Sequence, residues 1–341
     1  MKKPKVAILG FGLVGRVAAL MLHEQYQLSI FEAAPNANDN GAGALAAAML
    51  APMAESVICD TDIAQLGVEA MGLWPKLLAM LPSPVMYQQT GTLIVAHQQD
   101  MGDLRSFSQR LKPLAGHQAQ QLTGQDIAKL EPELAGRFHQ GIYLPSEGQL
   151  DNQAFYQASF ELLQTKDCRF YFGQSFELQH DEHSNALVND EVFDWIIDCR
   201  GIGAKKQLAG LRGVRGEVAR VYAPEVTLNR PVRLMHPRYP IYIAPKPNHE
   251  FVIGATEIES QDDGPITVRS TLELLSAAYT VHSGFAEARV MALNAGLRPA
   301  FTDNRPKISV NAKVISINGL YRHGYLLAPA VVKQALSKEL L

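Results

Sequence analysis

The chain has 341 residues, of which 47% are hydrophobic and 19% are charged, and its formal net charge is −3 at pH 7. This composition is typical of a folded protein and excludes a largely disordered chain. A single hydrophobic core usually stops growing at about 250–300 residues, so the length predicts two lobes. The slightly acidic balance, without a basic stripe, argues against nucleic acid as the main partner.

Three cysteines, Cys59, Cys168 and Cys199, include no C-x-x-C pair. This pattern predicts reduced thiols in a cytoplasmic protein, and no metal site is expected. No run approaches the ~18–20 apolar residues of a membrane span. The N-terminal MKK and the apolar stretch after it could imitate a secretory signal, but three glycines, Arg16 and His23 interrupt that stretch.

The strongest local pattern is a nucleotide-binding turn near the N-terminus. An apolar run, KVAILG, leads into GFGLVG, a helix is expected from Leu13 to about Gln25, and a second strand, LSIFE, ends at Glu32. In such a turn the first glycine permits the tight bend and the second lets the backbone approach a pyrophosphate. The third glycine allows close packing of helix on strand.

The helix that starts at Leu13 would point its unpaired amides and positive dipole end at the anion. Glu32 lies 17 residues after Gly15, where a carboxylate accepts both ribose hydroxyls of an adenosine and repels a 2′-phosphate. A glycine-rich turn in another kind of α/β protein is the alternative. We assign dinucleotide binding to Gly10, Gly12, Leu13, Val14, Gly15 and Glu32.

A segment of small residues, GAGALAAAMLAPMAE, extends from Gly41 to Glu55. Small side chains let the backbone come close to a flat group, although an alanine-rich helix would have the same composition. The next elements expected are helical sequence to about Met80, a β-like passage from Val85 with a strand at 90–95, helical and polar sequence at 100–133, and a turn followed by a new helix at 141–158.

Two strand-like runs follow at 169–178 and 191–198, and the second delivers the chain onto the glycine turn 199–203. An apolar strand that ends on a glycine turn indicates a return to the first sheet. Residues 216–259 alternate short β-patterned runs with prolines, which is typical of antiparallel sheet. The remaining elements expected are a helix at 268–284, a strand within 314–321 and a last helix from about Leu326.

This order predicts an α/β protein in which a Rossmann-like domain is interleaved with a mainly antiparallel β (α+β) substrate domain. We assign residues 1–84, 145–210 and 295–341 to the nucleotide-binding domain, and residues 85–144 and 211–294 to the substrate-binding domain. Nicotinamide dehydrogenases usually have a contiguous Rossmann domain, so they are the weakest alternative.

Four blocks of sequence give the chain a family resemblance. They are GFGLVG with Glu32, AAAMLAPMAE at 46–55, YIAP with FVIGATEIE within 242–259, and GLRPAFTD with GLYRHGYLLAP within 296–329. On these blocks nearly the whole chain resembles FAD-dependent oxidoreductases of the D-amino-acid oxidase superfamily, most closely the glycine oxidases of thiamine biosynthesis. It departs from the usual family pattern at Asn304, Ser309 and Leu320.

The resemblance implies a non-covalent FAD, because covalent attachment as in sarcosine oxidases needs a C-terminal cysteine and none follows Cys199. It implies that the small-residue segment lies along the flavin ring and that backbone amides before the last helix meet the pyrimidine end. By this resemblance, the residues that contact the cofactor are Ala46, Ala47, Ala48, Met49, Gly201, Arg322, His323, Gly324, Tyr325 and Leu326.

The resemblance also implies that Tyr242 and Arg298 bind the substrate carboxylate and that Arg322 lies near the substrate or the flavin rim. A guanidinium clamps a carboxylate bidentately, and a phenol adds one more donor. The residues alone leave open a structural salt bridge for Arg298, cross-strand packing for Tyr242 and a surface position for His323.

The implied reaction is FAD-dependent oxidative deamination of glycine or a small D-amino acid by hydride transfer to flavin N5. Its products are an imine or 2-oxo acid, ammonia and, with dioxygen as acceptor, hydrogen peroxide; a quinone acceptor would make the protein a dehydrogenase. The alternatives are a sarcosine or N-alkyl-glycine oxidase, a D-amino-acid dehydrogenase, a tRNA-modifying oxidase and a non-catalytic FAD-binding maturation or assembly partner. Related oxidases are often dimers or tetramers, so a homo-oligomer is among the expectations.

Overall fold

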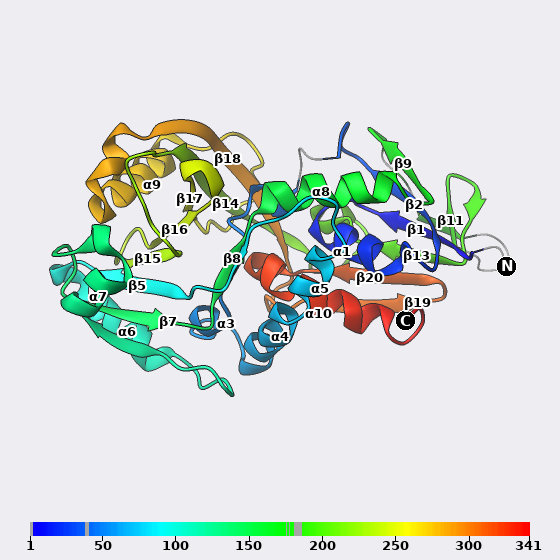
Figure 1. Ribbon diagram of the computed structural model, residues 1–341. Coiled ribbons are helices and arrows are strands. Elements are labelled where there is room, and N and C mark those ends of the chain that lie inside the picture. The colour runs from blue at the N-terminus through cyan, green and yellow to red at the C-terminus, as the bar shows by residue number, and fades with distance from the viewer. Residues whose placement is uncertain (1–2, 38–40, 175, 177, 181–185) are drawn as a thin grey trace.

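The computed structural model describes residues 3–37, 41–174, 176, 178–180 and 186–341, which form two lobes lying side by side (Figure 1). One lobe is built on a six-stranded sheet in the order β19-β20-β13-β1-β2-β9. Its strands are β1 (Lys5–Leu9), β2 (Gln27–Glu32), β9 (Cys168–Phe172), β13 (Trp195–Asp198), β19 (Lys307–Asn311) and β20 (Val314–Asn318). All neighbours in this sheet are parallel except β19 and β20.

Strand β1 is buried on both faces, as a central parallel strand requires. Val6 and Ile8 join one hydrophobic cluster, whereas Ala7 and Leu9 join a second cluster on the other face. Helix α1 (Leu13–Leu22) packs against α8 (Asn152–Gln164) and α10 (Gly324–Leu336), and α10 packs against α4 (Thr61–Met71), which is followed by α5 (Trp74–Leu78). The other face carries a small sheet of β10 (Leu178–His180), β11 (Ala186–Val188) and β12 (Glu191–Val192).

The second lobe is built on an eight-stranded sheet in the order β18-β14-β17-β16-β15-β5-β7-β6. Its strands are β5 (Thr92–Ala96), β6 (Gln120–Thr123), β7 (Gln140–Leu144), β14 (Arg212–Tyr222), β15 (Val232–Met235), β16 (Ile241–Pro245), β17 (Glu250–Gly254) and β18 (Arg289–Ala300). Only β15 and β5 pair in parallel within this sheet. Its helices are α6 (Met101–Arg110), α7 (Gly124–Leu130) and α9 (Val268–Val281).

The small-residue segment lies between the lobes, because Ala48 and Leu50 join a cluster of the first lobe and Ala47 packs with residues of the second. It is not the continuous alanine-rich helix that its composition allowed, because it forms two short helices, α2 (Ala42–Leu45) and α3 (Pro52–Glu55), on either side of strand β3 (Met49–Leu50). Strand β3 pairs with β8 (Gly148–Leu150), which also pairs with β4 (Tyr87–Gln88). The middle of the segment is therefore held as a strand by its pairing with β8.

The predicted α/β class and the interleaving of the two sheets along the chain are confirmed. The return to the first sheet is also confirmed, because β13 lies parallel to β1. The predicted domain boundaries stay a prediction, and strand β18 continues through the one placed between 294 and 295. Among the described residues, no helix combines the length and the apolar character needed to span a membrane.

Several local predictions were wrong. Residues 100–133 are not helical throughout, because β6 lies among them; its sequence QQLT is short and mostly exposed, so it carries no apolar alternation. The turn expected at the start of 141–158 instead contains most of β7 and all of β8. Helix α1 ends at Leu22 rather than near Gln25, and α10 begins at Gly324 rather than near Leu326.

The third glycine of the nucleotide-binding turn is required by packing. A Cβ placed on Gly15 would lie 2.0 Å from the carbonyl oxygen of Gly10, whereas a Cβ on Gly12 would meet no atom within 4 Å. The close approach of α1 to the end of β1 therefore depends on Gly15 and not on Gly12.

We expect Gly15→Ala to lower the free energy of unfolding by about 2 kcal/mol, because α1 must move away from β1. Gly12→Ala is the matched control and should unfold with a free energy within about 1 kcal/mol of wild type. Urea denaturation of the two purified variants measures both values. Equal stability of the variants would contradict the packing argument.

Candidate active site

A cavity of about 930 Å³ is lined by residues of both lobes. On one side it is lined by the glycine turn after β1 and the end of β2, and on the other by β14, β16 and β18. The small-residue segment and the start of α10 also line it. The sequence-predicted nucleotide turn and the predicted carboxylate ligands thus lie along one continuous cavity.

The N-terminus of α1 opens onto this cavity. Gly12 is its N-cap, no side chain caps the helix, and the first turn holds no acidic residue. Gly10, Gly12, Leu13 and Val14 line the cavity, whereas Gly15 packs behind it. Free backbone amides and open space at Gly12 suit the pyrophosphate of a dinucleotide.

Glu32 also lines the cavity, at the end of β2. Its Oε2 accepts a hydrogen bond of 2.6 Å from the Phe11 amide, and its Oε1 accepts one of 2.9 Å from the Ala34 amide. These bonds fix the carboxylate beside the glycine turn, and each oxygen keeps a lone pair for a further donor. This placement is compatible with the predicted ribose contact.

The small-residue segment presents Ala46, Ala47 and Met49 to the cavity. Ala48 departs from the predicted set: its φ is 51°, and its side chain packs in the hydrophobic cluster beneath α1 instead of lining the cavity. Side chains from other elements hold two carbonyls near the start of this segment. Tyr325 Oη donates to the Gly43 oxygen at 3.0 Å, and Asn152 Nδ2 donates to the Ala44 oxygen at 2.6 Å.

The C-terminal residues of the predicted cofactor site line the same cavity. Helix α10 begins at Gly324 without a side-chain cap, directly after the 3-10 turn η6 (Tyr321–His323). The predicted residues that line the cavity here are Gly201, Arg322, His323, Gly324, Tyr325 and Leu326. The helix N-terminus would stabilise negative charge on a bound flavin, and His323 is buried rather than on the surface.

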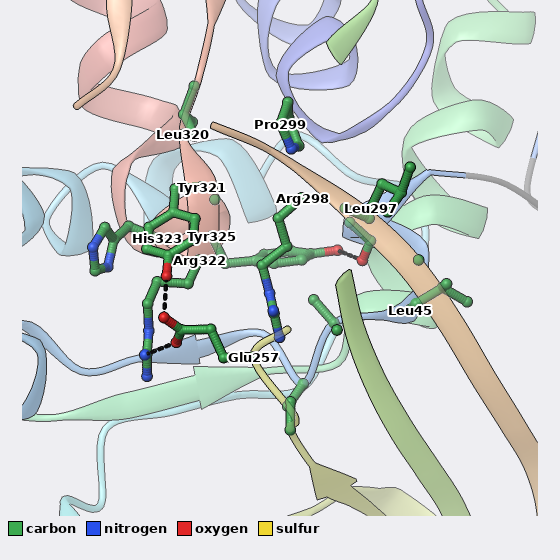
Figure 2. A pocket seen from close by; sticks show the side chains of 18 of the residues that line it. Leu45, Glu257, Leu297, Arg298, Pro299, Leu320, Tyr321, Arg322, His323 and Tyr325 are labelled. Carbon is green, nitrogen blue, oxygen red and sulfur yellow. Dashed lines mark hydrogen bonds and ion pairs between the residues drawn. The ribbon is translucent and has the colours of Figure 1, made fainter. Parts of the chain in front are cut away.

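Arg298 reaches into the cavity from β18 (Figure 2). Both terminal nitrogens of its guanidinium donate to the Thr256 carbonyl at 3.1 Å. The guanidinium crosses Gly216 on the neighbouring strand so closely that a Cβ there would lie 2.3 Å from its Nη2. Within the described part of the chain, no carboxylate forms a salt bridge with Arg298, so the structural ion pair left open by the sequence is not formed there.

Tyr242 lines the cavity from β16. Its ring packs across the sheet on Gly254, where a Cβ would come within 2.8 Å of the phenol oxygen, so cross-strand packing and a place in the cavity coexist. Burial raises the pKa of the Tyr242 phenol, and nearby Arg298, Arg322 and Arg233 only partly oppose this. The phenol therefore stays protonated and can donate a hydrogen bond at neutral pH.

An ion network around the buried Glu55 borders the same cavity. Glu55, the last residue of α3, accepts a hydrogen bond from Arg233 Nη2 at 2.8 Å and forms an ion pair with Arg322 Nε at 2.9 Å, and His323 Nδ1 lies 3.3 Å from its Oε2. Arg322 Nη1 also pairs with Glu257 Oε2 at 2.6 Å, and the Tyr321 hydroxyl donates to the same carboxylate (Figure 2).

The network sets the ionisation of Glu55. Burial alone would raise the pKa of this carboxyl, but Arg322, Arg233 and His323 more than reverse that effect and hold its pKa well below the usual range. Glu55 therefore stays charged in the folded protein. Arg322 keeps its charge as well, because Glu55 and Glu257 outweigh the burial that would lower its pKa.

The sequence analysis did not assign a role to Glu55, Arg233 or Glu257. Glu55 ends the block AAAMLAPMAE, and Glu257 lies in FVIGATEIE, so two of the three stand in sequences that carried the family resemblance. Arg233 had no local signal, since its place beside Glu55 depends on two segments 178 positions apart. Among the described residues, no group of three or more His, Cys, Asp or Glu side chains could hold a metal ion.

Comparison with known proteins identifies the family of this chain. Residues 5–335 match the family described as FAD dependent oxidoreductase, and the chain belongs to that family. The glycine turn, the uncapped helix ends and the row of small residues fit FAD, which is its cofactor.

Particular relatives narrow the comparison. The chain is 39% identical to the thiamine biosynthesis oxidoreductase ThiO of Rhizobium etli, over 98% of this chain and 96% of that protein. Among solved structures, it resembles the glycine oxidase of Bacillus cereus with a TM-score of 0.83 and 22% identity, over 98% of this chain and 96% of that one. It also resembles an iminodiacetate oxidase of Chelativorans sp. with a TM-score of 0.80 and 23% identity, over 96% and 93% of the two chains.

The buried Glu55 carboxylate makes stability depend on pH. Its pKa is lower in the folded protein than the ordinary value of 4.5, so its contribution is present at neutral pH and is lost as the pH falls below about 4.5. We expect Glu55→Gln to lower the free energy of unfolding by about 3 kcal/mol at pH 7, because the ion pair of a buried carboxylate with Arg233 is lost and Arg322 keeps only one of its two carboxylate partners.

Chemical denaturation at pH 7 and at pH 4 measures this effect, and the difference between wild type and Glu55→Gln should shrink at the lower pH. Glu259→Gln is the control, because Glu259 pairs with Arg212 while 65% of its side chain is exposed. It should change stability by less than about 1 kcal/mol. Equal losses in the two variants would contradict the role given to burial.

Proposed function

We propose that this FAD-dependent oxidoreductase oxidatively deaminates glycine or a similarly small D-amino acid. The observation that supports this most is Arg298, whose guanidinium borders the cavity with only carbonyl partners among the described contacts. Tyr242 lines the same cavity, and so do the predicted flavin segment and the nucleotide turn. The similarity to ThiO and to the glycine oxidase structure supports the same reaction.

Charge balance supports a substrate with one carboxylate. Three guanidiniums, those of Arg233, Arg298 and Arg322, lie close enough to influence Tyr242. Two of them pair with Glu55 and Glu257, which leaves one positive charge on Arg298. An amino acid with a neutral amine carries one negative charge, so its binding would neutralise the site without placing an uncompensated charge in a buried cavity.

In the proposed reaction, Arg298 and the protonated Tyr242 hold the carboxylate and so orient the α-carbon toward the small-residue segment. When bound, FAD would supply the two-electron acceptor at its N5 for the hydride that leaves the α-carbon. The amine nitrogen gives its lone pair to form a C=N bond and loses a proton. Water then adds to the imine, which releases ammonia and a 2-oxo acid.

The acceptor that reoxidises the flavin is dioxygen or a quinone in this proposal. With dioxygen the product is hydrogen peroxide, and a peroxide assay under air identifies this reaction. With a quinone the protein is a D-amino-acid dehydrogenase, and an artificial dye supports turnover that air does not.

Replacement of the proposed carboxylate ligand tests the assignment. Arg298→Gln should raise KM strongly and lower kcat/KM for glycine about 100-fold, since a charge-assisted bidentate contact contributes about 2–3 kcal/mol. The visible spectrum of the bound flavin should not change. Steady-state kinetics and absorption spectra of the same preparation measure both.

Arg289→Gln is the matched control, because Arg289 begins the same strand and its side chain is exposed. It should keep the wild-type kcat/KM. If Arg298→Gln also kept it, Arg298 would not be the carboxylate ligand. If both variants lost activity together, the loss would report on the strand rather than on the guanidinium.

A second candidate is an N-substituted glycine such as iminodiacetate or sarcosine. The cavity continues past Ala54 to Arg110 and Arg238, both of which are exposed, and a carboxylate on the nitrogen substituent could pair with either. The structural similarity to an iminodiacetate oxidase supports a trial of this substrate. Iminodiacetate that outperforms glycine in the wild type but not in Arg238→Gln would favour the second candidate.

A further inference from the structure

We propose that Lys246 is a positioning residue that ties the strand carrying Tyr242 to the flavin-facing segment and so sets the place of the flavin relative to the substrate. The proposal rests on the proposed function only in placing the flavin along Ala46, Ala47 and Met49. Lys246 does not itself line the cavity, and nothing in the family resemblance assigned it a role.

The contacts of Lys246 are complete. It directly follows β16, and only 7% of the residue is exposed. Nζ donates to the Ala47 carbonyl at 2.7 Å, the Leu150 carbonyl at 2.8 Å and Gln149 Oε1 at 3.0 Å. All three ammonium hydrogens therefore have an acceptor, and two of these acceptors are main-chain oxygens.

These acceptors belong to the small sheet that shapes the flavin-facing segment. Met49 pairs with Gln149 across β3 and β8, and the Leu150 amide donates to the Ala48 carbonyl at 3.1 Å. Lys246 thus bonds both to β8 and to Ala47, which leads into β3. The Ala47 carbonyl that it holds belongs to a residue whose neighbours Ala46 and Met49 face the cavity.

The same lysine is anchored in the substrate lobe. Its backbone amide donates to the Glu250 carbonyl at 2.7 Å, which closes the turn between β16 and β17. Tyr242 stands four positions earlier on β16. A displacement of the Ala47 segment relative to β16 would break the Nζ contacts, so Lys246 couples the two parts whose separation hydride transfer depends on.

An apolar residue would fill this position without the free-energy cost of burying a charge. Burial lowers the pKa of Lys246 to about 7, which shows that the charged form is costly at this position. Loss of the side chain should therefore cost little overall stability, because the loss of three hydrogen bonds is offset by removal of a buried charge. The substitution should instead change FAD binding and flavin reduction, because the carbonyls that Lys246 holds shape the proposed flavin site.

The test compares Lys246→Met with wild type at pH 6, where the lysine is charged. We expect at least tenfold weaker FAD binding to the apoprotein, a shifted visible spectrum of the bound flavin and at least tenfold slower anaerobic flavin reduction at saturating glycine. The dissociation constant of glycine and the melting temperature of the apoprotein should stay close to wild type. Lys205→Met is the control, because Lys205 is exposed and its Nζ donates to Gln261 Oε1 on the surface.

Lys246→Arg is the second variant, because it keeps a charged donor; it should retain more FAD affinity than Lys246→Met. Wild-type FAD affinity and reduction rate in Lys246→Met would overturn the proposal. So would a lower apoprotein melting temperature with unchanged flavin properties, or failure of both variants to fold, since each outcome indicates a purely structural lysine. FAD affinity and the flavin spectrum need no turnover, so failure of the proposed amine oxidation in wild type would be seen separately.

Discussion

The site depends on the buried carboxylate of Glu55. This side chain ends α3 and the small-residue segment, and it pairs with Arg233 of the eight-stranded sheet and with Arg322 of η6, the turn before α10. Three segments distant in sequence are therefore fixed at one point beside the cavity. A carboxylate without these partners could not stay charged when buried. In the proposed function, its charge also offsets guanidiniums that would otherwise compete with Arg298 for the substrate carboxylate.

The order of the elements along the chain explains how both sheets come to line one cavity. The first sheet supplies a glycine turn and a helix end that suit a pyrophosphate. The residues predicted to bind the substrate carboxylate, Tyr242 and Arg298, lie on the second sheet. The chain leaves that sheet, builds β14 to β18, and returns through β19 and β20 to α10. Interleaving therefore places Tyr242 and Arg298 in the same cavity as the glycine turn and the start of α10, which is the last helix of the chain.

Features that depend on near neighbours could be predicted from the sequence. The turn from Gly10 to Gly15 and the return of β13 were recognised because their glycines and apolar runs are contiguous. Strand β6 was missed because it is short, polar and exposed. The contacts of Glu55 with Arg233 and of Lys246 with Ala47 were also missed, because each joins segments more than 170 positions apart and leaves no periodic signal. Tyr242 and Arg298 were identified only through the family resemblance.

The most direct test of the central claim is the visible spectrum of the purified, FAD-containing protein on addition of glycine in the absence of oxygen. If the nucleotide-binding turn and the proposed carboxylate ligands, Arg298 and Tyr242, belong to one active site, glycine is oxidised and the yellow flavin bands bleach. Ammonia then appears in an amount equal to the reduced flavin. Flavin bands that stay unchanged with glycine, D-alanine, sarcosine and iminodiacetate would contradict the claim. The protein would then bind FAD without oxidising an amine, as a maturation or assembly partner would.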